Sequence, residues 1–427
     1  MKASNRSQLI QLGATAVASS LVTLFVKNFI SGEKKIKQRI PRKYDIADGQ
    51  FERSMSQLLG PPILNGNRIT RLENGVEIFP AMLAGIARAK ETICFETFIY
   101  WSGEMTERFS IALSAKAREG VKVHVLIDGM GCDCVKGESL RRMREAGVEL
   151  EVYHLHTHNL TNVNQRTHRK LLVIDGKQGF TGGVGIADEW MGDANTPDNW
   201  RDTHYQVDGP AVAQIQAAFL DNWMKTHATV LHGDAYFPLI EEQGPHRCQM
   251  FKSSPMEGSE SARLMYLLSI TAAEKSLRVG NAYFVPDDLV TEALIAAVRR
   301  GVEVEVLLPG KYQDSGPVRA ASRHRWGKLL ENGVRIFEYE PTMYHRKVMI
   351  IDDLWVSVGS ANFDNRSFRL NDEANLNVFD SGFALEESAA FAKDKMAARE
   401  VTWEQWKKRP MLQKASDATM GLLRSQM

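Results

Sequence analysis

Cysteine is scarce in this chain: four residues, Cys94, Cys132, Cys134 and Cys248, among 427. A protein of this size held together by disulfides carries many more, so a disulfide framework is excluded and the thiols are expected to stay reduced. The Cys132-Asp133-Cys134 stretch has no second pair of Cys or His at zinc spacing. We therefore expect neither a bound metal nor another cofactor.

An excess of charge of either sign is also missing. Lys and Arg number 53 and Asp and Glu 52, which gives a net charge of +1. Because proteins that bind nucleic acid usually carry a basic field, nucleic acid is not an expected partner. Apolar residues at 44% and charged residues at 25% are typical of a globular protein with a full core. The length is sufficient for two domains of ordinary size.

A long apolar run is missing from most of the chain, and residues 9–26 come nearest to one. A membrane-spanning helix needs about 20 mainly apolar residues, and polar side chains dilute this run. Six cations follow it closely: Lys34, Lys35, Lys37, Arg39, Arg42 and Lys43. Cations on this side of a span hold that side in the cytoplasm and attract anionic lipid. We expect residues 1–45 to be a membrane anchor and basic linker at the inner (cytoplasmic) membrane, with the body of the protein in the cytoplasm.

Two alternatives remain open for this N-terminal segment. The first is a cleaved signal peptide with its small-residue site at 16–18, although cleavage there would leave an apolar terminus. The second is a buried helix of a soluble protein. Both are less favoured than the anchor.

A motif of the form H-x-K-x-x-x-x-D occurs twice, at 168–175 and at 345–352. In both copies a glycine follows the aspartate at the same distance, Gly182 in one and Gly359 in the other. Two imidazoles and two ammonium groups, brought together, are the residue types of a phosphate-transfer site.

The repeat extends beyond the motif. Alternating, β-branched runs at 120–128 and 301–309 each follow a helical segment, and so do further strands at 147–153 and 333–339. Each half therefore reads β-α-β-α-β-β. This order predicts an α/β fold of two pseudo-symmetric mixed-sheet halves covered by helices, with the active site between the halves.

A repeat of about two hundred residues indicates a duplicated domain, because solenoid repeats are shorter than about fifty. The boundary is expected near residues 243–248. We therefore predict a first domain at 46–245 and a second at 246–427.

The spacing within each motif predicts which side chains share a face. Residues i and i+2 of a strand point to the same side, so His168 should project with Lys170 and His345 with Lys347. Four apolar residues follow each lysine, as expected for a strand in the middle of a covered sheet.

The two aspartates of the motif lie at the other end of these predicted strands. Asp175 and Asp352 belong to the candidate catalytic set as members of the motif, but their parity is opposite to that of the histidines. We expect them to have a structural or charge-pairing role rather than to contact substrate.

The doubled H-x-K-x4-D is identified as the signature of the phospholipase D superfamily. The flanking stretches resemble those of bacterial cardiolipin synthases, at 95–103, 182–190, 200–204, 281–287, 359–367 and 370–373. The resemblance runs from about Asn67 to the end of the second half. It implies a phospholipase D-like fold and a phosphatidyltransferase that makes cardiolipin from two phosphatidylglycerols, with release of glycerol.

The resemblance also implies roles for single residues. A neutral histidine attacks phosphorus to form a covalent phosphatidyl-histidine, and a protonated histidine donates a proton to the leaving alcohol. By this likeness His168 is the nucleophile and His345 the acid. The non-bridging oxygens would be held by Lys170, Lys347, Asn362 and Ser360.

Members of the family orient each imidazole through a downstream carboxylate, and the matching positions are Asp202 and Glu373. A carboxylate on one ring nitrogen fixes the tautomer and leaves the other nitrogen reactive. The alternative is that each carboxylate pairs with a neighbouring arginine, Arg201 or Arg369.

The chain departs from the family at Gly185, where an asparagine is common, while the second half keeps Asn362. This difference weakens the expected share of the first half in phosphate binding. The backbone amides of Gly182 and Gly183 could compensate.

Other residues are expected to be structural. Five histidines are interpreted as loop or satisfied core residues: His154, His156, His158, His204 and His324. Near the C-terminus, Trp403, Trp406 and the basic stretch 407–409 indicate either an edge that lies at a membrane interface or a helix packed on the second half.

Phosphatidylglycerol and the membrane are thus the expected partners, and the oligomeric state has no signature in the sequence. The alternative function is hydrolysis of phospholipid headgroups to phosphatidic acid, since water could replace the lipid hydroxyl without a change of catalytic residues. A nucleic-acid phosphodiesterase is disfavoured by the charge balance.

Overall fold

The computed structural model describes residues 13–16, 18–20, 22–23, 36, 38–132, 137–153, 165–255 and 261–422. Most of the predicted anchor, Cys134 and the histidines at 154, 156 and 158 lie outside these ranges. Within them, no helix combines the length and the apolar character that crossing a membrane requires.

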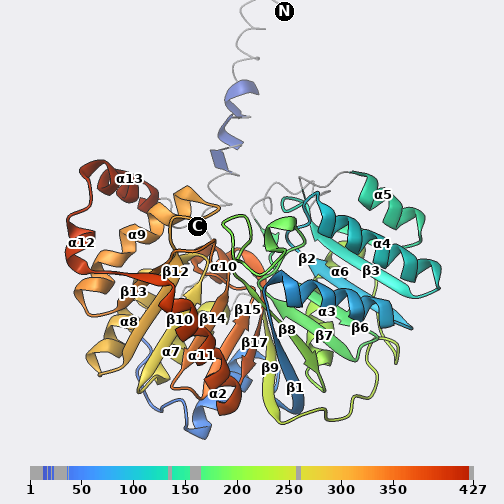
Figure 1. Cartoon of the computed structure of the whole chain (residues 1–427), viewed down its shortest axis with the longest axis horizontal. Coiled ribbons are helices and arrows are strands. Elements are labelled where there is room, and N and C mark those ends of the chain that lie inside the picture. Colours follow the sequence, from blue (N-terminus) through green and yellow to red (C-terminus); the bar gives the residue numbers. More distant parts are fainter. Residues whose placement is uncertain are drawn as a thin grey trace, which may run out of the picture.

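One mixed sheet of sixteen strands runs through both halves of the protein (Figure 1). Across the sheet, the strands of the second half are β18 (Ala398–Val401), β13 (Arg335–Tyr339), β12 (Glu303–Pro309), β10 (Ser276–Asn281), β14 (Lys347–Ile351), β15 (Trp355–Gly359), β17 (Asn371–Val378) and β9 (His246–Ser253). Those of the first half continue as β1 (Leu64–Glu73), β8 (Thr203–Asp208), β7 (Gln178–Gly182), β6 (Leu171–Ile174), β2 (Thr92–Thr97), β3 (Lys122–Asp128) and β4 (Glu149–Tyr153). The short β5 (Arg166–Thr167) pairs with β17, and β11 (Phe284–Val285) pairs with β16 (Phe363–Asp364) apart from the main sheet.

The order of the strands is symmetric about the centre of the sheet. The parallel trio β2-β3-β4 corresponds to β10-β12-β13, and the antiparallel run β6-β7-β8 corresponds to β14-β15-β17. The adjacent strands β1 and β9 join the halves at the centre. This arrangement confirms the predicted fold of two pseudo-symmetric mixed-sheet halves.

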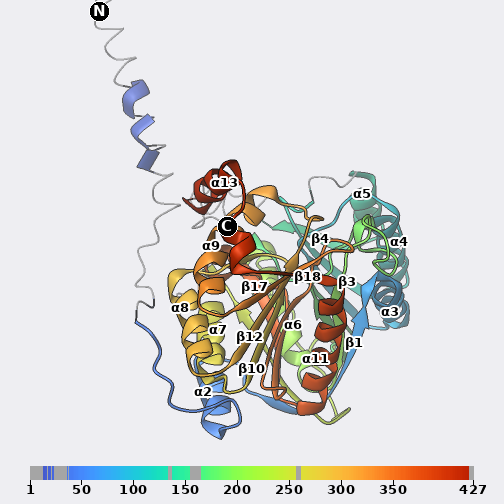
Figure 2. The ribbon, with the colours of Figure 1, turned by 60° about the vertical axis from the view of Figure 1, so that its left-hand side comes forward.

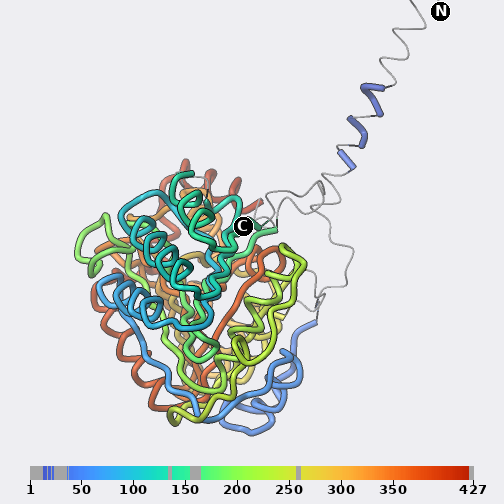
Figure 3. Tube along the Cα trace, turned by 90° about the vertical axis from the view of Figure 1, so that its right-hand side faces the viewer, coloured from blue at the N-terminus to red at the C-terminus, as the bar shows by residue number. Residues whose placement is uncertain are grey.

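Helices cover the sheet because its strands are buried; β2 and β17 are buried along their whole length. The helices of the first half are α3 (Asn74–Arg88), α4 (Glu104–Arg118), α5 (Gly137–Glu145), the 3-10 turn η1 (Asp188–Trp190) and α6 (Val212–His227). The remaining helices are α2 (Gly49–Leu59), α7 (Ser261–Ala272), α8 (Asp288–Arg299), α9 (Gly316–Glu331), α10 (Asn365–Arg369), α11 (Ser381–Met396), α12 (Trp403–Lys407) and α13 (Met411–Leu422). In the first half, α3, α4 and α5 lie next to one another as an outer layer (Figure 3).

In each half a single long helix packs on the strands apart from the other helices. It is α6 in the first half, on β2, β4, β6 and β7, and α11 in the second, on β10, β13, β14 and β15. Their apolar faces join one cluster of buried side chains drawn from both halves, including Phe219 and Phe383. This shared core fixes the position of one half relative to the other, as the two central strands also do.

The structure differs from the sequence expectation at the start of the motif strands. The strands β6 and β14 begin at Leu171 and Lys347, so each histidine precedes its strand. The reason is that the backbone of each histidine pairs with the other half: His168 N donates to Asp372 O at 2.9 Å, and His345 N donates to Arg201 O at 2.7 Å. The helix expected from Arg323 also begins earlier, at Gly316, with a proline in its first turn.

Candidate active site

The two motif histidines are each paired with a carboxylate of the opposite half. Nδ1 of His168 lies 3.0 Å from Glu373 Oε2, and Nδ1 of His345 lies 2.7 Å from Asp202 Oδ2. Both rings are largely buried and both carboxylates are fully buried. Because a carboxylate accepts the Nδ1 proton, Nε2 of each ring is the nitrogen left to react.

This crossed arrangement bears on one alternative for the carboxylates, the pairing of Asp202 with Arg201. Arg201 does not pair with its neighbour's side chain; its guanidinium is bound by Asp394, with Nε to Oδ1 at 2.9 Å. Glu373 receives hydrogen bonds from Ser360, Ser367 and Asn371 in addition to His168. The sequence identified both carboxylates but not the crossing.

The hydroxyl of Ser360, which was expected to help hold phosphate oxygens, hydrogen-bonds a site carboxylate in this structure. Ser360 Oγ donates to Glu373 Oε2 at 2.5 Å and accepts from the backbone of Ala374 at 3.0 Å. Its proton is therefore already used to fix the carboxylate. Ser360 is a positioning residue for Glu373.

Two residues that the sequence did not single out have the same role in the two halves: each donates a hydrogen bond to a site carboxylate. Trp190 and Ser367 each stand eight residues after the downstream glycine of their half. Trp190 Nε1 donates to Asp202 at 3.0 Å, and Ser367 Oγ donates to Glu373 at 2.7 Å. Their side chains differ in type, so only a comparison of the two halves position by position could have found them.

The lysines lie beside the histidines as the strand parity predicts. Lys170 Nζ donates to His168 O at 2.8 Å. Lys347 Nζ donates to His345 O at 2.7 Å and lies 3.0 Å from Nε2 of the same ring. Both lysines are buried. Each ammonium group is thus held within reach of an anion that would bind at a reactive Nε2.

Asn362 is buried near these groups, and its Oδ1 has no hydrogen-bond partner among the described residues. A half-turn of the amide presents its NH2 group at that place instead. A donor role for Asn362 towards a bound anion stays a prediction.

Burial is the main influence on the protonation of the site. It lowers the pKa of His168 to about 4, with a smaller lowering from the charges of Lys170 and Lys347 against the opposing effect of Glu373. Burial and the charge of Lys347 likewise lower the pKa of His345. Since Lys347 acts on His168 across the halves, the two motifs share one electrostatic site.

The lysines and carboxylates are also perturbed. Burial, followed by the charge of Lys347, lowers the pKa of Lys170 to about 7, and burial lowers that of Lys347 to about 8. Burial raises the pKa of Asp202 and Glu373, but the paired histidines, the motif lysines and further hydrogen bonds together hold the pKa of both carboxyls below its ordinary value. The site therefore carries ionised carboxylates behind neutral imidazoles.

The aspartates of the two motifs lie away from this site. Asp175 accepts hydrogen bonds from the backbone of Lys90, Glu91 and Thr92, at 2.8–3.1 Å. Asp352 accepts the equivalent set from residues 274–276, at 2.7–2.8 Å. These contacts agree with a structural role, since they fix the turns that lead into β2 and β10.

The residue between the histidine and the lysine of each motif is a buried arginine that the sequence did not single out. Arg346 donates to Asp394 at 2.8 Å and to Glu387 at 2.6 Å. Arg169 donates to Ala218 O at 2.6 Å and to Asp221 at 3.1 Å. The identity of this residue in both copies was a usable signal, because a buried arginine needs a matched set of acceptors.

The departure from the family at Gly185 has a steric basis. A Cβ at Gly185 would lie 2.6 Å from the side chain of Ile99, so no larger residue fits without movement. The amides expected to compensate are not both free, because Gly183 N donates to Thr203 O at 3.1 Å. At this position the first half thus offers only a backbone amide, whereas the second half offers the side chain of Asn362.

The glycines after each motif are required by close packing. A Cβ would lie 2.6 Å from His204 Nδ1 at Gly182 and 2.3 Å from Ala374 O at Gly359. The expectation of a satisfied core histidine is wrong for His204, whose buried ring nitrogens have no hydrogen-bond partner among the described residues. Burial lowers its pKa to about 3, so the ring is neutral.

Aromatic rings enclose both histidines. Phe98 lies edge-on to His168, with ring centroids 5.2 Å apart, and Trp190 and Trp200 lie 5.1 and 5.3 Å from His345. The rings exclude water and explain the burial that lowers the histidine pKa values.

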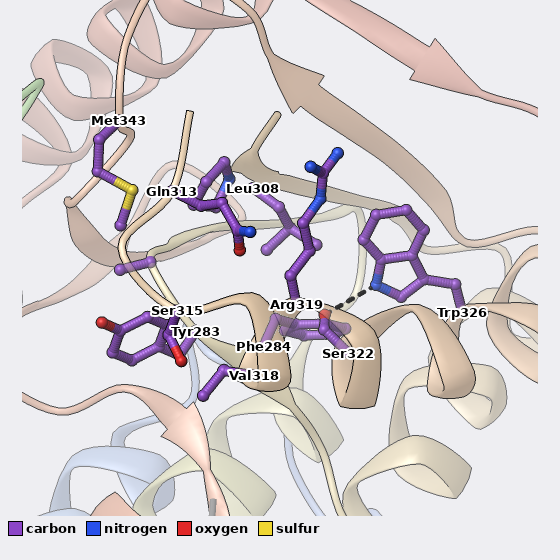
Figure 4. A pocket seen from close by; sticks show the side chains of 12 residues that line it. Tyr283, Phe284, Leu308, Gln313, Ser315, Val318, Arg319, Ser322, Trp326 and Met343 are labelled. Carbon is purple, nitrogen blue, oxygen red and sulfur yellow. Dashed lines mark hydrogen bonds between the residues drawn. The ribbon is translucent and has the colours of Figure 1, made fainter. Parts of the chain in front are cut away.

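A pocket lies beside the His345 side of the site, and its lining includes Tyr283, Arg319 and Met343. Figure 4 shows Met343 and Gln313 on one side of it and Trp326 on the other. Met343 is two residues before His345, and Ala282 and Tyr283 continue from Asn281, which pairs with Lys347. The lining mixes apolar side chains with Gln313, Ser315 and Arg319.

No group of three or more His, Cys, Asp or Glu side chains in the described part of the chain is placed to hold a metal ion. Cys94 and Cys248 are buried free thiols, and Cys132 is partly buried.

Comparison with known proteins gives a consistent assignment. A sequence family described as "Cardiolipin synthase, PLD-like domain" matches residues 82–223 and 266–395. Cardiolipin synthase A of Pseudomonas syringae pv. syringae is 37% identical over 352 residues, which is 82% of this chain and 73% of that protein. Cardiolipin synthase A of Pseudomonas putida F1 is 36% identical over 354 residues, with the same coverage.

A solved structure supports the fold. The phosphatidylserine synthase of Haemophilus influenzae Rd KW20 superposes with a TM-score of 0.70 at 14% identity, over 88% of this chain and all of that one. The two matched regions fall one in each half, and each contains one H-x-K motif. The chain is a phospholipase D-type phosphatidyltransferase and belongs to the cardiolipin synthase family of the phospholipase D superfamily.

Proposed function

We propose that this enzyme makes cardiolipin from two phosphatidylglycerols through a covalent phosphatidyl-histidine. The observation that carries the proposal is the pair of buried histidines, each with Nδ1 on a carboxylate of the other half and with a lysine beside it. Cardiolipin synthesis by a phospholipase D-like enzyme follows from the relatives. The covalent intermediate, the roles of single residues and the identity of the substrates are parts of the proposal.

In the first step, Nε2 of His168 attacks the phosphorus of one phosphatidylglycerol, and the bond from phosphorus to the glycerol oxygen breaks. Nε2 of His345 gives its proton to that oxygen, and glycerol leaves. A pKa of about 4 keeps His168 neutral and nucleophilic near neutral pH. The phosphodiester anion, once bound, raises the pKa of His345 and so favours the proton that the acid needs.

In the second step, the terminal hydroxyl of another phosphatidylglycerol attacks the phosphorus, and the bond from phosphorus to His168 Nε2 breaks. His345 takes the proton of that hydroxyl, which returns the site to its starting state. The charges of Lys170 and Lys347 and an N–H of Asn362 stabilise the non-bridging oxygens in both steps. We assign the pocket beside Met343 to the glycerol of the acceptor lipid, because Met343 in its lining stands two residues before His345.

Product analysis tests the function. The purified enzyme is incubated with phosphatidylglycerol, and the lipids are identified by mass spectrometry. Equal amounts of cardiolipin and glycerol are expected. Phosphatidic acid without cardiolipin would make the enzyme a hydrolase.

A trapping experiment tests the roles. A phosphatidyl ester of p-nitrophenol has a leaving group that needs no proton, so His345→Ala should still release one burst of p-nitrophenol and retain labelled phosphatidyl on the protein. The double variant His168→Ala/His345→Ala is the control and should retain none. Label on the His168→Ala single variant instead would reverse the two roles.

A further inference from the structure

Helix α13 is packed with its polar side inward. Its buried residues are Asp417 and Gly421, whereas Met411, Leu412 and Leu422 are 76%, 87% and 83% exposed. A surface helix of a soluble protein normally buries its apolar stripe and exposes its charges. We call the exposed side the outer face of α13, formed by Met411, Leu412, Ala415, Ala418 and Leu422.

Specific contacts hold α13 in this orientation. The buried Asp417 accepts hydrogen bonds from Arg323 and Arg409, both at 3.0 Å. Gly421 lies against the His324 ring, where a Cβ would come within 2.6 Å. Turning the helix to bury its leucines would leave Asp417 without these partners. The orientation of α13, and with it the exposure of the outer face, is therefore fixed by specific contacts.

The tryptophans before α13 belong to this support. Trp406 Nε1 donates to Arg323 O at 2.9 Å, and the guanidinium of Arg409 lies 3.8 Å from a Trp406 ring centroid. Trp403 stacks on Trp406 at 5.2 Å. The sequence left two alternatives for this segment, an edge at a membrane interface or a helix packed on the second half. Trp406 is packed on the second half, and the exposed apolar surface lies on α13 instead.

The surroundings of the outer face are basic. Residues 403–422 contain four cations and two anions, and one anion, Asp417, is buried against arginines. Lys407 and Lys408 are exposed and Lys414 is half-buried, and in the described part of the chain none of these three forms an ion pair. An apolar strip flanked by cations is complementary to a surface that is apolar within and anionic at its boundary.

Helix α9 connects this surface to the catalytic site. Its residues Arg319, Ser322 and Trp326 line the pocket beside Met343, and its residues Arg323 and His324 contact α13. In Figure 1, α13 lies at the upper edge of the molecule, and α10, which carries Ser367 of the site, lies nearer its centre. Figure 2 shows α13 on the same upper edge, above α9.

We infer that the outer face of α13 docks the enzyme on an anionic phospholipid bilayer. The apolar side chains enter the boundary between headgroups and acyl chains, and the lysines lie among the headgroup phosphates. The inference rests on the proposed phospholipid substrate, because docking here brings the pocket beside His345 towards the lipid that it uses.

The test compares two physical forms of one substrate, with the full chain. Activity is measured on vesicles of phosphatidylglycerol and phosphatidylethanolamine, and on a short-chain phosphatidylglycerol dispersed as monomers. The test variant is Leu412→Glu/Leu422→Glu. The matched control is Leu239→Glu/Leu385→Glu, which adds the same charges at residues 96% and 57% exposed elsewhere.

The test variant is expected to lose about tenfold or more of its activity on vesicles and to keep its activity on dispersed substrate, whereas the control keeps both. Equal vesicle activity in the test variant and the wild type would overturn the docking. Loss on both forms would also overturn it, because the face would then support the fold. A wild type that makes no cardiolipin from either form would instead refute the proposed function.

A fluorescent label separates the bilayer from a second copy of the chain. An environment-sensitive dye is attached to Leu412→Cys, with Leu239→Cys as the control, after the accessible native thiols are replaced by serine. A blue shift on addition of the vesicles, at the Leu412 position alone, supports the inference. A blue shift that follows protein concentration without vesicles would overturn it in favour of self-association.

Discussion

Glu373 of the second half hydrogen-bonds Nδ1 of His168 in the first half, at 3.0 Å. Asp202 of the first half does the same for His345 of the second, at 2.7 Å. Neither half on its own contains an oriented histidine. Each histidine is therefore oriented only when the two halves are associated, which explains how a duplicated domain yields a single site.

The crossed pair gives the first prediction. Glu373→Gln keeps the size of the side chain but lets an amide replace the carboxylate on Nδ1, which favours the wrong tautomer of His168. We expect kcat to fall by roughly 10²–10⁴-fold, as when the orienting carboxylate of a catalytic histidine is replaced elsewhere. The control is Glu386→Gln, an exposed glutamate on α11, which should retain full activity.

The second prediction concerns the aspartates of the motif. Asp175→Ala removes the acceptor of three backbone N–H groups, so we expect a loss of about 2–4 kcal/mol in the free energy of unfolding. The kcat of the folded fraction should stay within about twofold of wild type, because Asp175 lies outside the site. Denaturant unfolding and assays well below the melting temperature measure the two quantities. A large fall in kcat at unchanged stability would show that Asp175 acts in the chemistry.

Much of this organisation was predictable from local pattern. The repeated motif identified the histidines and lysines as candidate site residues. The alternation of side chains along a strand predicted that Asp175 and Asp352 do not face the same side as the histidines. Local pattern could not give the crossing, because it depends on β5 pairing with β17 between the halves. It also missed Trp190 and Ser367, which fill equivalent positions with different chemistry.

Burial was the other quantity that the sequence did not provide. Arg346 reads as one more charged residue beside a histidine, yet it is fully buried against Glu387 and Asp394. His204 was interpreted as a loop or satisfied core residue, yet its buried ring nitrogens have no hydrogen-bond partner in the described structure. The burial of Arg346 depends on α11, which lies about forty residues further along the chain.

The third prediction is a difference between two pH profiles. In the free enzyme the nucleophile is available above the pKa of His168, about 4, and the ammonium of Lys170 is lost as pH rises through about 7. Bound phosphodiester raises the pKa of the lysines and of His345. We expect the alkaline limb of kcat to lie at higher pH than that of kcat/KM. Coincident limbs would contradict the assignment of these groups to phosphate binding.

The fourth prediction is that an inactivating change stabilises the protein. The folded-state pKa of Lys170 is about 7, below its ordinary value of 10.5, so between these values the unfolded chain binds more protons and stability rises with pH. Near neutral pH the buried ammonium is therefore a cost. Lys170→Met should abolish activity and raise Tm by several degrees, measured by calorimetry. Lys177→Met, at an exposed lysine that forms no ion pair with the described residues, is the control and should leave Tm unchanged. A fall in Tm would mean that the ammonium stabilises the fold.

The fifth prediction separates transfer from hydrolysis at the pocket beside Met343. Val318 lines this pocket, and Val318→Phe would fill it without touching the histidines, lysines or carboxylates of the site. If the pocket receives the acceptor glycerol, the phosphatidyl-histidine still forms but water competes better for it. The ratio of phosphatidic acid to cardiolipin should then rise roughly tenfold, while the rate of glycerol release changes little.

The matched control is Val76→Phe, which adds the same ring at a valine 55% exposed on α3. An equal loss of both products in Val318→Phe would show that the pocket shapes the donor site instead. Because water and the acceptor hydroxyl use the same histidines, the two products share every catalytic group, and only a space for the second lipid can favour one over the other. The shape of this pocket, more than the motif, would then make the enzyme a transferase.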